Sequence, residues 1–206
     1  MVAFRGPFAF GLRDGDDDDE IAAAAGKDPV AFRREMLAGQ PRVLRVLDLA
    51  ASKSNWGSPL PKGRARGIAV HEAFGSVCAH VAEVSLDGDG IRVHKVTTAF
   101  DCGLVVNPLT VEAQLQSAVA FGLSASLHSR ITFKDGKVEQ SNFHDYQVLR
   151  MNEMPEVEVH LVPGGEKPTG VGEPGTPPIA PAVANALFAL TGKRARSLPL
   201  DDQKWT

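Results

Sequence analysis

The sequence feature that most constrains this chain is a run rich in glycine and proline in its last quarter. Six prolines and five glycines fall between residues 163 and 181. Proline lacks a backbone N–H and glycine disfavours regular structure, so this density is too high for a helix or a central strand. The run is therefore predicted to be a stiff loop.

A helix is predicted to begin where this loop ends. Apolar residues recur at the three-and-four spacing of one helix face, namely Ile179, Ala182, Val183, Ala186, Leu187 and Leu190. Thr176 suits the N-cap, Pro177 the first helical position and Gly192 the C-terminal end. One carboxylate, Glu173, lies just before this helix start, between a glycine and a proline. It is a candidate catalytic group, although a solvated loop glutamate fits the same spacing.

Composition narrows the class of protein. The 206 residues are 43% hydrophobic and 23% charged, which is ordinary for a globular protein of about one domain. A net charge of −3 gives no reason to expect a nucleic-acid partner or an acidic membrane surface. Cys78 and Cys102 show no paired ligand spacing. Neither a membrane span nor a signal peptide is recognised, so a cytoplasmic location is expected.

The N-terminal part of the chain is predicted to flank the main domain. Residues 1–20 are expected to be a weakly structured acidic segment, because the run Asp14–Glu20 repels itself and lacks the residue order of a calcium loop. Residues 21–65 are expected to be a helical covering segment. Its helices are predicted at Ile21–Ala25, from the cap Asp28 with Pro29 to near Gly39, and from about Pro41 to Lys53.

Residues 66–206 are expected to form the main, C-terminal domain, which begins with antiparallel strands. Apolar residues alternate with less apolar ones at Ile68, Val70, Val77, Ala79, Val81 and Val84. A turn at Asp87–Gly90 then opens the return strand. Cys78 and His80 would share one face of such a strand, but no second close pair completes a zinc site. Ordinary packing is therefore favoured, and no metal ligand is assigned on this chain.

A long helix is predicted from about Leu109 to Leu127, capped by Asn107 or Thr110. Beside its apolar stripe runs a second stripe with a small residue at every fourth position, Ala118, Gly122 and Ser126. Small side chains there let another backbone or a flat ligand come close. Gln114 carries an amide that both donates and accepts, so it suits the edge of a heterocycle. From the residues alone, a plain surface glutamine is the simpler interpretation.

A second hairpin and one more strand complete the pattern. The hairpin is predicted at 131–138, with its turn at Lys134–Lys137, and the strand at Val157–Leu161 leads into the glycine- and proline-rich loop. The predicted fold class is α+β, with a mostly antiparallel sheet and long helices packed across it.

Four blocks of the sequence occur in an order typical of one protein family. They are Gly67–Ser76, Asp101–Pro108, Ser141–Tyr146 and Gly170–Gly175. Together they resemble the C-terminal part of the molybdenum-binding large subunit of the xanthine dehydrogenase/aldehyde oxidase family. Within it, the resemblance is closest to the branch that contains the beta subunit of isoquinoline 1-oxidoreductase. It covers roughly residues 20–200, and four ordered blocks are far more specific than a lone Gly-x-Gly-Glu. It implies a domain of the molybdenum-cofactor-binding type.

The resemblance also implies roles for individual residues. Glu173 matches the active-site glutamate, which lies beside the molybdenum and takes the proton from its hydroxide ligand. A general base has to stay ionised and within hydrogen-bond reach, and a helix start favours the charged form. Gln114 matches the glutamine that hydrogen-bonds the pterin of the cofactor. Val171 and Gly172 match the backbone that passes close to the metal centre.

By the same resemblance, the protein would be a molybdenum hydroxylase that oxidises an N-heteroaromatic or aldehyde substrate with oxygen from water. Its cofactor would be molybdenum–molybdopterin cytosine dinucleotide. Electrons would pass to iron–sulfur clusters on a 2Fe–2S small subunit, and the N-terminal half of the large subunit would be a further partner. Many full-length members of this branch carry an export signal for the periplasm.

Several features depart from the family pattern. Ser117 and Ala118 stand where the family usually has two glycines, so the backbone there is less permissive. The acidic run at 14–20 has no counterpart, and a full large subunit is several times longer. The alternative is therefore a truncated, non-catalytic remnant that acts as a stable binding or interaction domain.

Overall fold

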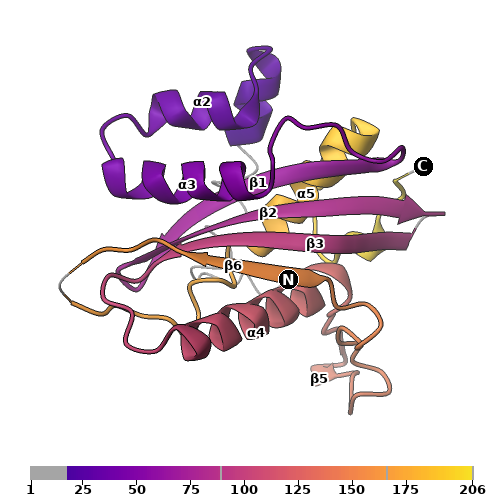
Figure 1. Ribbon diagram of the computed structural model, residues 1–206. Helices are drawn as coiled ribbons and strands as arrows, with labels where there is room; N and C mark the ends of the chain where they lie inside the picture. The colour runs from indigo at the N-terminus through magenta and orange to yellow at the C-terminus, as the bar shows by residue number, and fades with distance from the viewer. Residues whose placement is uncertain (1–17, 89, 166, 206) are drawn as a thin grey trace.

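A four-stranded sheet forms the centre of the computed structural model, which describes residues 18–88, 90–165 and 167–205 (Figure 1). Its strand order is β1-β2-β3-β6. The strands are β1 (Arg64–Ala73), β2 (Ser76–Asp87), β3 (Gly90–Asp101) and β6 (Glu156–Leu161). The first three pair antiparallel, whereas β6 lies parallel to β3. The predicted α+β class with a mostly antiparallel sheet is confirmed.

The central strand β2 is buried on both faces, although the sequence suggested a half-buried alternation. Every residue from Ser76 to Ala82 is buried. Val77, Ala79 and Val81 face one helical layer, and the even-numbered residues face the other. Apart from His80, both sets are apolar or small because helices cover both sides of the sheet.

One face of the sheet is covered by α3 (Pro41–Lys53), with α2 (Pro29–Met36) packed outside it (Figure 1). The predicted cap of α2 is confirmed, since Asp28 Oδ1 accepts from the N–H of Val30 at 3.0 Å and of Ala31 at 2.9 Å. Residues 18–24 are helical as well.

The expected solvated acidic run is wrong for its last three residues, 18–20, which belong to this first helix. Asp19 is 5% exposed and forms an ion pair with Arg33, which is 1% exposed. A buried guanidinium needs a carboxylate partner, and the run supplies one. Residues 14–17 lie outside the described residues, as does the rest of the segment before them.

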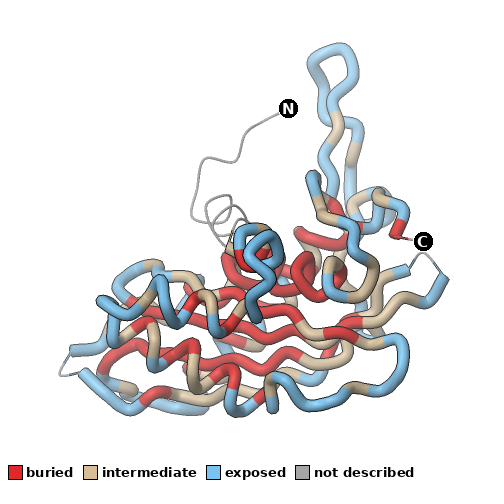
Figure 2. The backbone as a smooth tube through the Cα atoms, turned by 90° about the horizontal axis from the view of Figure 1, so that it is seen from above, coloured by how far each residue is buried: buried red, intermediate tan, exposed pale blue. Residues whose placement is uncertain are grey.

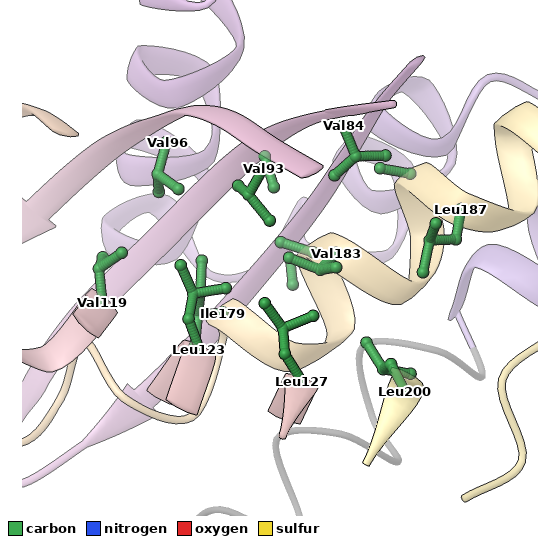
Figure 3. Packing of buried hydrophobic residues seen from close by; sticks show 14 of the residues in the cluster. Val84, Val93, Val96, Val119, Leu123, Leu127, Ile179, Val183, Leu187 and Leu200 are labelled. Carbon is green, nitrogen blue, oxygen red and sulfur yellow. The ribbon is translucent and has the colours of Figure 1, made fainter. Parts of the chain in front are cut away.

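The other face is covered by α4 (Pro108–Leu127) and α5 (Ile179–Thr191). Their apolar side chains meet those of β2 and β3 in the main core, and the short 3₁₀ turn η1 (Leu200–Asp202) closes its end (Figure 3). Asn107 caps α4 as predicted, with its Oδ1 accepting from the Thr110 N–H at 3.2 Å. Gly122 lies so close to α5 that an added Cβ would be 2.3 Å from a methyl group of Ile179. The small stripe on α4 therefore serves close packing against another backbone.

The predicted start of α5 is wrong. Pro178 is the N-cap, and Thr176 instead donates its N–H to the carbonyl oxygen of Glu173 at 2.9 Å. A residue before proline disfavours the helical conformation, and the two consecutive prolines displace the helix start past both. Nor is α5 apolar on one face only, because every residue from Ile179 to Leu187 is buried. The predicted end is confirmed, since Gly192 adopts φ 74° and donates to the carbonyl of Phe188 at 2.8 Å.

Residues 128–152 form an exposed arm that extends from the body (Figure 2). It contains the predicted hairpin, with β4 (Phe133–Lys134) and β5 (Lys137–Val138) joined at Asp135–Gly136. Within the described residues, no helix combines the length and apolar character that crossing a membrane requires.

Candidate functional site

The loop that carries Glu173 crosses the end of the sheet where β3 and β6 finish and α4 begins (Figure 1). The first part of this loop, residues 162–169, runs alongside the end of β3 and the segment after it. Val162 donates its N–H to the carbonyl of Phe100 at 2.8 Å, and Thr169 donates to Cys102 at 2.9 Å. A Cβ on Gly103 would lie 2.2 Å from the carbonyl oxygen of Lys167, so only glycine permits this approach. Both segments are therefore fixed against each other.

The turn between β1 and β2 holds the loop just before Glu173. Gly170 donates its N–H to the carbonyl oxygen of Phe74 at 3.1 Å. Ser76 is fully buried, and its hydroxyl donates to the carbonyl of Gly170 at 2.6 Å and contacts the Thr169 hydroxyl at 2.6 Å. Because a buried hydroxyl requires partners, this contact fixes the loop position at residue 170.

A buried histidine holds the loop just after Glu173. His80 on β2 is 0% exposed, and its Nε2 lies 2.7 Å from the carbonyl oxygen of Gly175. Its Nδ1 lies 2.8 Å from the hydroxyl oxygen of Thr98 on β3. Since a carbonyl only accepts, Nε2 carries the proton and Nδ1 accepts from Thr98. Burial lowers the pKa of His80 to about 4, against a weaker opposing effect of the Gly175 hydrogen bond, so the ring is neutral at physiological pH.

Glu173 itself is exposed, in the short bridge between these two attachments. Its carbonyl oxygen accepts from Thr176, which closes a turn. Its carboxylate makes no hydrogen bond or ion pair with any described residue. Residues 174–178 lie between Glu173 and Ile179, the first residue of α5, and no hydrogen bond joins the Glu173 carboxylate to a described N–H group of that helix start.

The loop also packs on the first turns of α4, where Gln114 lies. Val171 packs against the cluster that includes Val111 and Leu115. An added Cβ on Gly175 would lie 3.0 Å from both Leu115 and Ala118. Gln114 is exposed and directly precedes Leu115 on the helix. The structure thus brings together the loop with Glu173 and the part of α4 with Gln114.

The loop backbone is open at Gly172, next to Glu173. It is exposed, and an added Cβ would meet nothing within 4 Å. Val171, by contrast, is partly buried and directed toward the protein. At these two positions the loop therefore packs on the protein through the Val171 side chain and leaves its backbone accessible at Gly172.

Two hollows on the surface of the described residues, of about 210 and 520 Å³, lie between α3 and the sheet and beside the β2–β3 hairpin. Neither is lined by Glu173 or Gln114. Cys78 lies 3.8 Å from His80, but among the described residues no group of three or more metal-ligating side chains converges.

Sequence reasoning missed the two residues that attach the loop, Ser76 and His80. One signal is present: His80 is polar in an otherwise apolar strand, but the local pattern relates it only to Cys78, as a zinc ligand. The partner atoms lie 94 and 95 residues away along the chain, and no local pattern connects them.

The same fold occurs in larger oxidoreductases of known structure. Aldehyde oxidoreductase from Desulfovibrio gigas superposes with a TM-score of 0.54 at 24% identity, over 61% of this chain and 14% of that one. Quinoline 2-oxidoreductase from Pseudomonas putida 86 superposes with a TM-score of 0.53 at 20% identity, over 61% of this chain and 17% of that one. The fold is therefore that of one domain of such proteins.

The family follows from the sequence. Residues 40–155 match the model of the molybdopterin cofactor-binding domain, and the chain belongs to this family. The beta subunit of isoquinoline 1-oxidoreductase from Brevundimonas diminuta is 36% identical over 187 residues, or 88% of this chain. Membrane-bound aldehyde dehydrogenase (pyrroloquinoline-quinone) of Gluconacetobacter polyoxogenes is 34% identical over 203 residues, also 88% of this chain. Nicotinate dehydrogenase of Pseudomonas putida KT2440 has a subunit that is 32% identical over 210 residues, or 90%.

These findings confirm the resemblance expected from the sequence. The chain spans 24%, 26% and 17% of the lengths of these three relatives. It therefore corresponds to a part of the longer subunits.

Proposed function

We propose that this chain is the C-terminal part of the catalytic subunit of a molybdenum hydroxylase, which oxidises an N-heteroaromatic or aldehyde substrate with oxygen from water. The observation that carries the proposal is the Glu173 loop: an accessible carboxylate on backbone that is attached on both sides, next to the helix with Gln114. A general base needs this combination of access and fixed position. The substrate classes named by the relatives support the choice.

The residues present fit a molybdopterin cofactor. The open backbone at Gly172 gives a flat ring system room to approach, and the exposed Gln114 amide donates and accepts hydrogen bonds. We assign the contact with the cofactor to Gln114, Val171 and Gly172. The cytosine dinucleotide form is proposed from the resemblance alone.

When bound, the cofactor supplies a metal that accepts two electrons and transfers oxygen derived from water. The contribution of this chain is to hold a base in place. The carboxylate of Glu173 accepts a proton at the reacting centre, while the attachments on its two sides keep it from swinging away. Iron–sulfur clusters on a 2Fe–2S small subunit would supply the acceptor for the electrons.

The remaining part of the large subunit is proposed to complete the site. The outward side of α4 carries no charge, and its exposed residues after the first position are Leu109, Thr110, Ala113, Gln114, Ser117 and Phe121. Leu109 and Phe121 are large apolar side chains exposed on this side, as on surfaces that another polypeptide covers. The covering polypeptide would also complete the wall of the site beside Glu173.

One observation favours the alternative, a non-catalytic binding domain. Glu173 is exposed and its carboxylate has no hydrogen-bond or ion-pair partner among the described residues, as expected of a solvated loop glutamate. In that case the chain would associate with a partner but take up no molybdenum.

The test is substitution of Glu173 in the complex formed by co-expression with the remaining large-subunit polypeptide and the small subunit. We expect Glu173→Gln to retain molybdenum and to lower turnover by roughly 10² to 10⁴, because the amide cannot accept the proton. Glu139→Gln, an exposed glutamate on the arm, is the matched control and should retain turnover.

Molybdenum content and reduction of an electron acceptor are measured for each variant. A Glu173→Gln complex with full molybdenum and full turnover would remove this residue from the mechanism. A wild-type complex that assembles without molybdenum would instead support the non-catalytic alternative.

A further inference from the structure

We infer that His80 is a positioning residue that holds the Glu173 loop through the carbonyl of Gly175. No sequence motif of the resemblance includes His80, and its hydrogen bonds go to neither Glu173 nor Gln114. Its effect on Glu173 is therefore indirect. It acts two residues further along the chain, at the end of the turn that Glu173 opens.

The geometry at His80 specifies one protonation pattern. Nε2–H donates to Gly175 over 2.7 Å, and Nδ1 accepts from the Thr98 hydroxyl over 2.8 Å. Both ring nitrogens are thus satisfied, with the ring fully buried. Because His80 lies on β2 and is hydrogen-bonded to Thr98 of β3 and to Gly175, it links the loop to both strands.

Gly175 has little freedom to compensate for a change at His80. It is buried against Leu115 and Ala118, where even a methyl group would be in tight contact at 3.0 Å. The carbonyl of Gly175 would be left buried and unpaired without the Nε2 donor. Since a buried unpaired carbonyl is unfavourable, the loop would shift to find another partner or water.

The Ser76 attachment cannot replace the His80 attachment. It holds residues 169 and 170, before Glu173, whereas His80 holds residue 175, after it. With only the first in place, the segment after Glu173 would be held by packing against Leu115 and Ala118 but by no hydrogen bond to the Gly175 carbonyl. The two attachments therefore act on separate halves of the loop.

Hydrogen exchange of backbone amides in the full 206-residue chain tests this inference without any cofactor. The Thr176 amide reports on the turn with Glu173, and the Gly170 amide reports on the Ser76 side. We expect His80→Asn to speed exchange at Thr176 by about tenfold, because the shorter side chain does not reach Gly175. Exchange at Gly170 and in β2 should change much less.

His80→Gln is the rescuing variant, because its longer amide brings an N–H donor to about the position of Nε2. It should keep exchange at Thr176 within about threefold of the wild type. Thr98→Val is nearly isosteric and removes the hydroxyl that donates to Nδ1. This leaves a buried ring nitrogen unpaired and favours a shift of the ring away from Gly175, so exchange at Thr176 should rise even if His80→Asn does not fold.

Equal exchange at Thr176 in the wild type and in His80→Asn would overturn the inference. The same holds if the increase is equal in β2 and at Thr176, or if His80→Gln behaves like His80→Asn. If His80→Asn does not fold, unchanged exchange at Thr176 in Thr98→Val would overturn it.

The link from loop position to proton transfer rests on the proposed function. In the co-expressed complex we expect His80→Asn to lower kcat with little change in KM and in molybdenum content, and His80→Gln to restore kcat. An active Glu173→Gln complex would end the proposed function but leave the exchange result intact. An inactive Glu173→Gln complex with a fully active His80→Asn complex would end only this inference.

Discussion

At the scale of single residues, buried polar side chains define the end of the sheet where the candidate site lies. Asp101, at the end of β3, accepts from Arg42 at 3.0 Å and from the Gly103 N–H at 2.9 Å. Burial works against its charge, but Arg42, the Gly103 N–H and Arg45 outweigh burial and lower its pKa. The carboxylate thereby ties α3 to the loop after β3, next to the Ser76 and His80 attachments.

A different polar residue gives stability a measurable dependence on pH. His128, at the C-terminal cap of α4, lies 2.6 Å from Asp201 of η1, and this hydrogen bond raises the pKa of His128 despite partial burial. A raised folded-state pKa means that the stabilisation is complete below the unfolded pKa of 6.5 and is lost as the pH rises through the folded value.

We therefore expect the melting temperature to fall as the pH rises above about 6.5, and we expect the part of this fall that comes from His128 to disappear in Asp201→Asn. His80 does not interfere in this window, because its lowered pKa affects stability only below 6.5. Thermal melts of both proteins across the window provide the measurement. Identical pH profiles would show that the pair contributes nothing.

At the scale of elements, α5 crosses β1 in close backbone contact at Gly67. A Cβ on Gly67 would lie 2.2 Å from the backbone nitrogen of Ala186 and 2.3 Å from the carbonyl oxygen of Ala182. Both are helix backbone atoms, so neither can move aside without shifting α5. The core between the helix and the sheet therefore depends on this glycine.

We expect Gly67→Ala to reduce the free energy of unfolding by about 3 kcal/mol or more, because overpacking against backbone is costly. Gly172→Ala is the matched control, since its Cβ meets nothing within 4 Å, and its stability should stay within about 1 kcal/mol of the wild type. Urea unfolding of the two variants measures the difference. Similar losses in both would contradict the assigned contact.

Most elements could be predicted because their signals are local. The caps Asp28 and Asn107 and the terminator Gly192 each act within a few residues, and all three are confirmed. The start of α5 differs from the prediction because Pro177 suits a first helical turn only when no second proline follows it.

The attachments of the site could not be predicted in this way. Whether His80 binds a metal, packs or holds a loop depends on which atom faces it across the fold. Residues 18–20 illustrate the same limit, since only the buried Arg33 makes a helical, paired Asp19 favourable. The placement of Glu173 and Gln114 near each other came from resemblance rather than from pattern.

At the scale of the whole molecule, the two helical layers differ in character. The outer side of α2 and α3 is charged, with ion pairs such as Arg34–Asp48 at 2.6 Å. The outer side of α4 carries no charge, and Leu109 and Phe121 are 76% and 70% exposed there. The α4 side is therefore the one suited to cover by the remaining part of the large subunit.

We expect Phe121→Asp to weaken association with that polypeptide by at least about tenfold, because a charge would be buried without a partner. Met36→Asp on α2 adds the same charge at a 53% exposed position on the opposite side and should have no effect. Co-purification and titration calorimetry of the two variants decide between the surfaces. Unchanged binding of Phe121→Asp would exclude the α4 side.

The attachments of the Glu173 loop also have a consequence for the order of events during synthesis. Ser76 and His80 leave the ribosome more than ninety residues before the atoms they hold, because the contacts span 94 and 95 positions. Distant pairings form only after the intervening chain has closed upon itself. The carboxylate of Glu173 is thus set in place late, when the strands that support its loop are already joined.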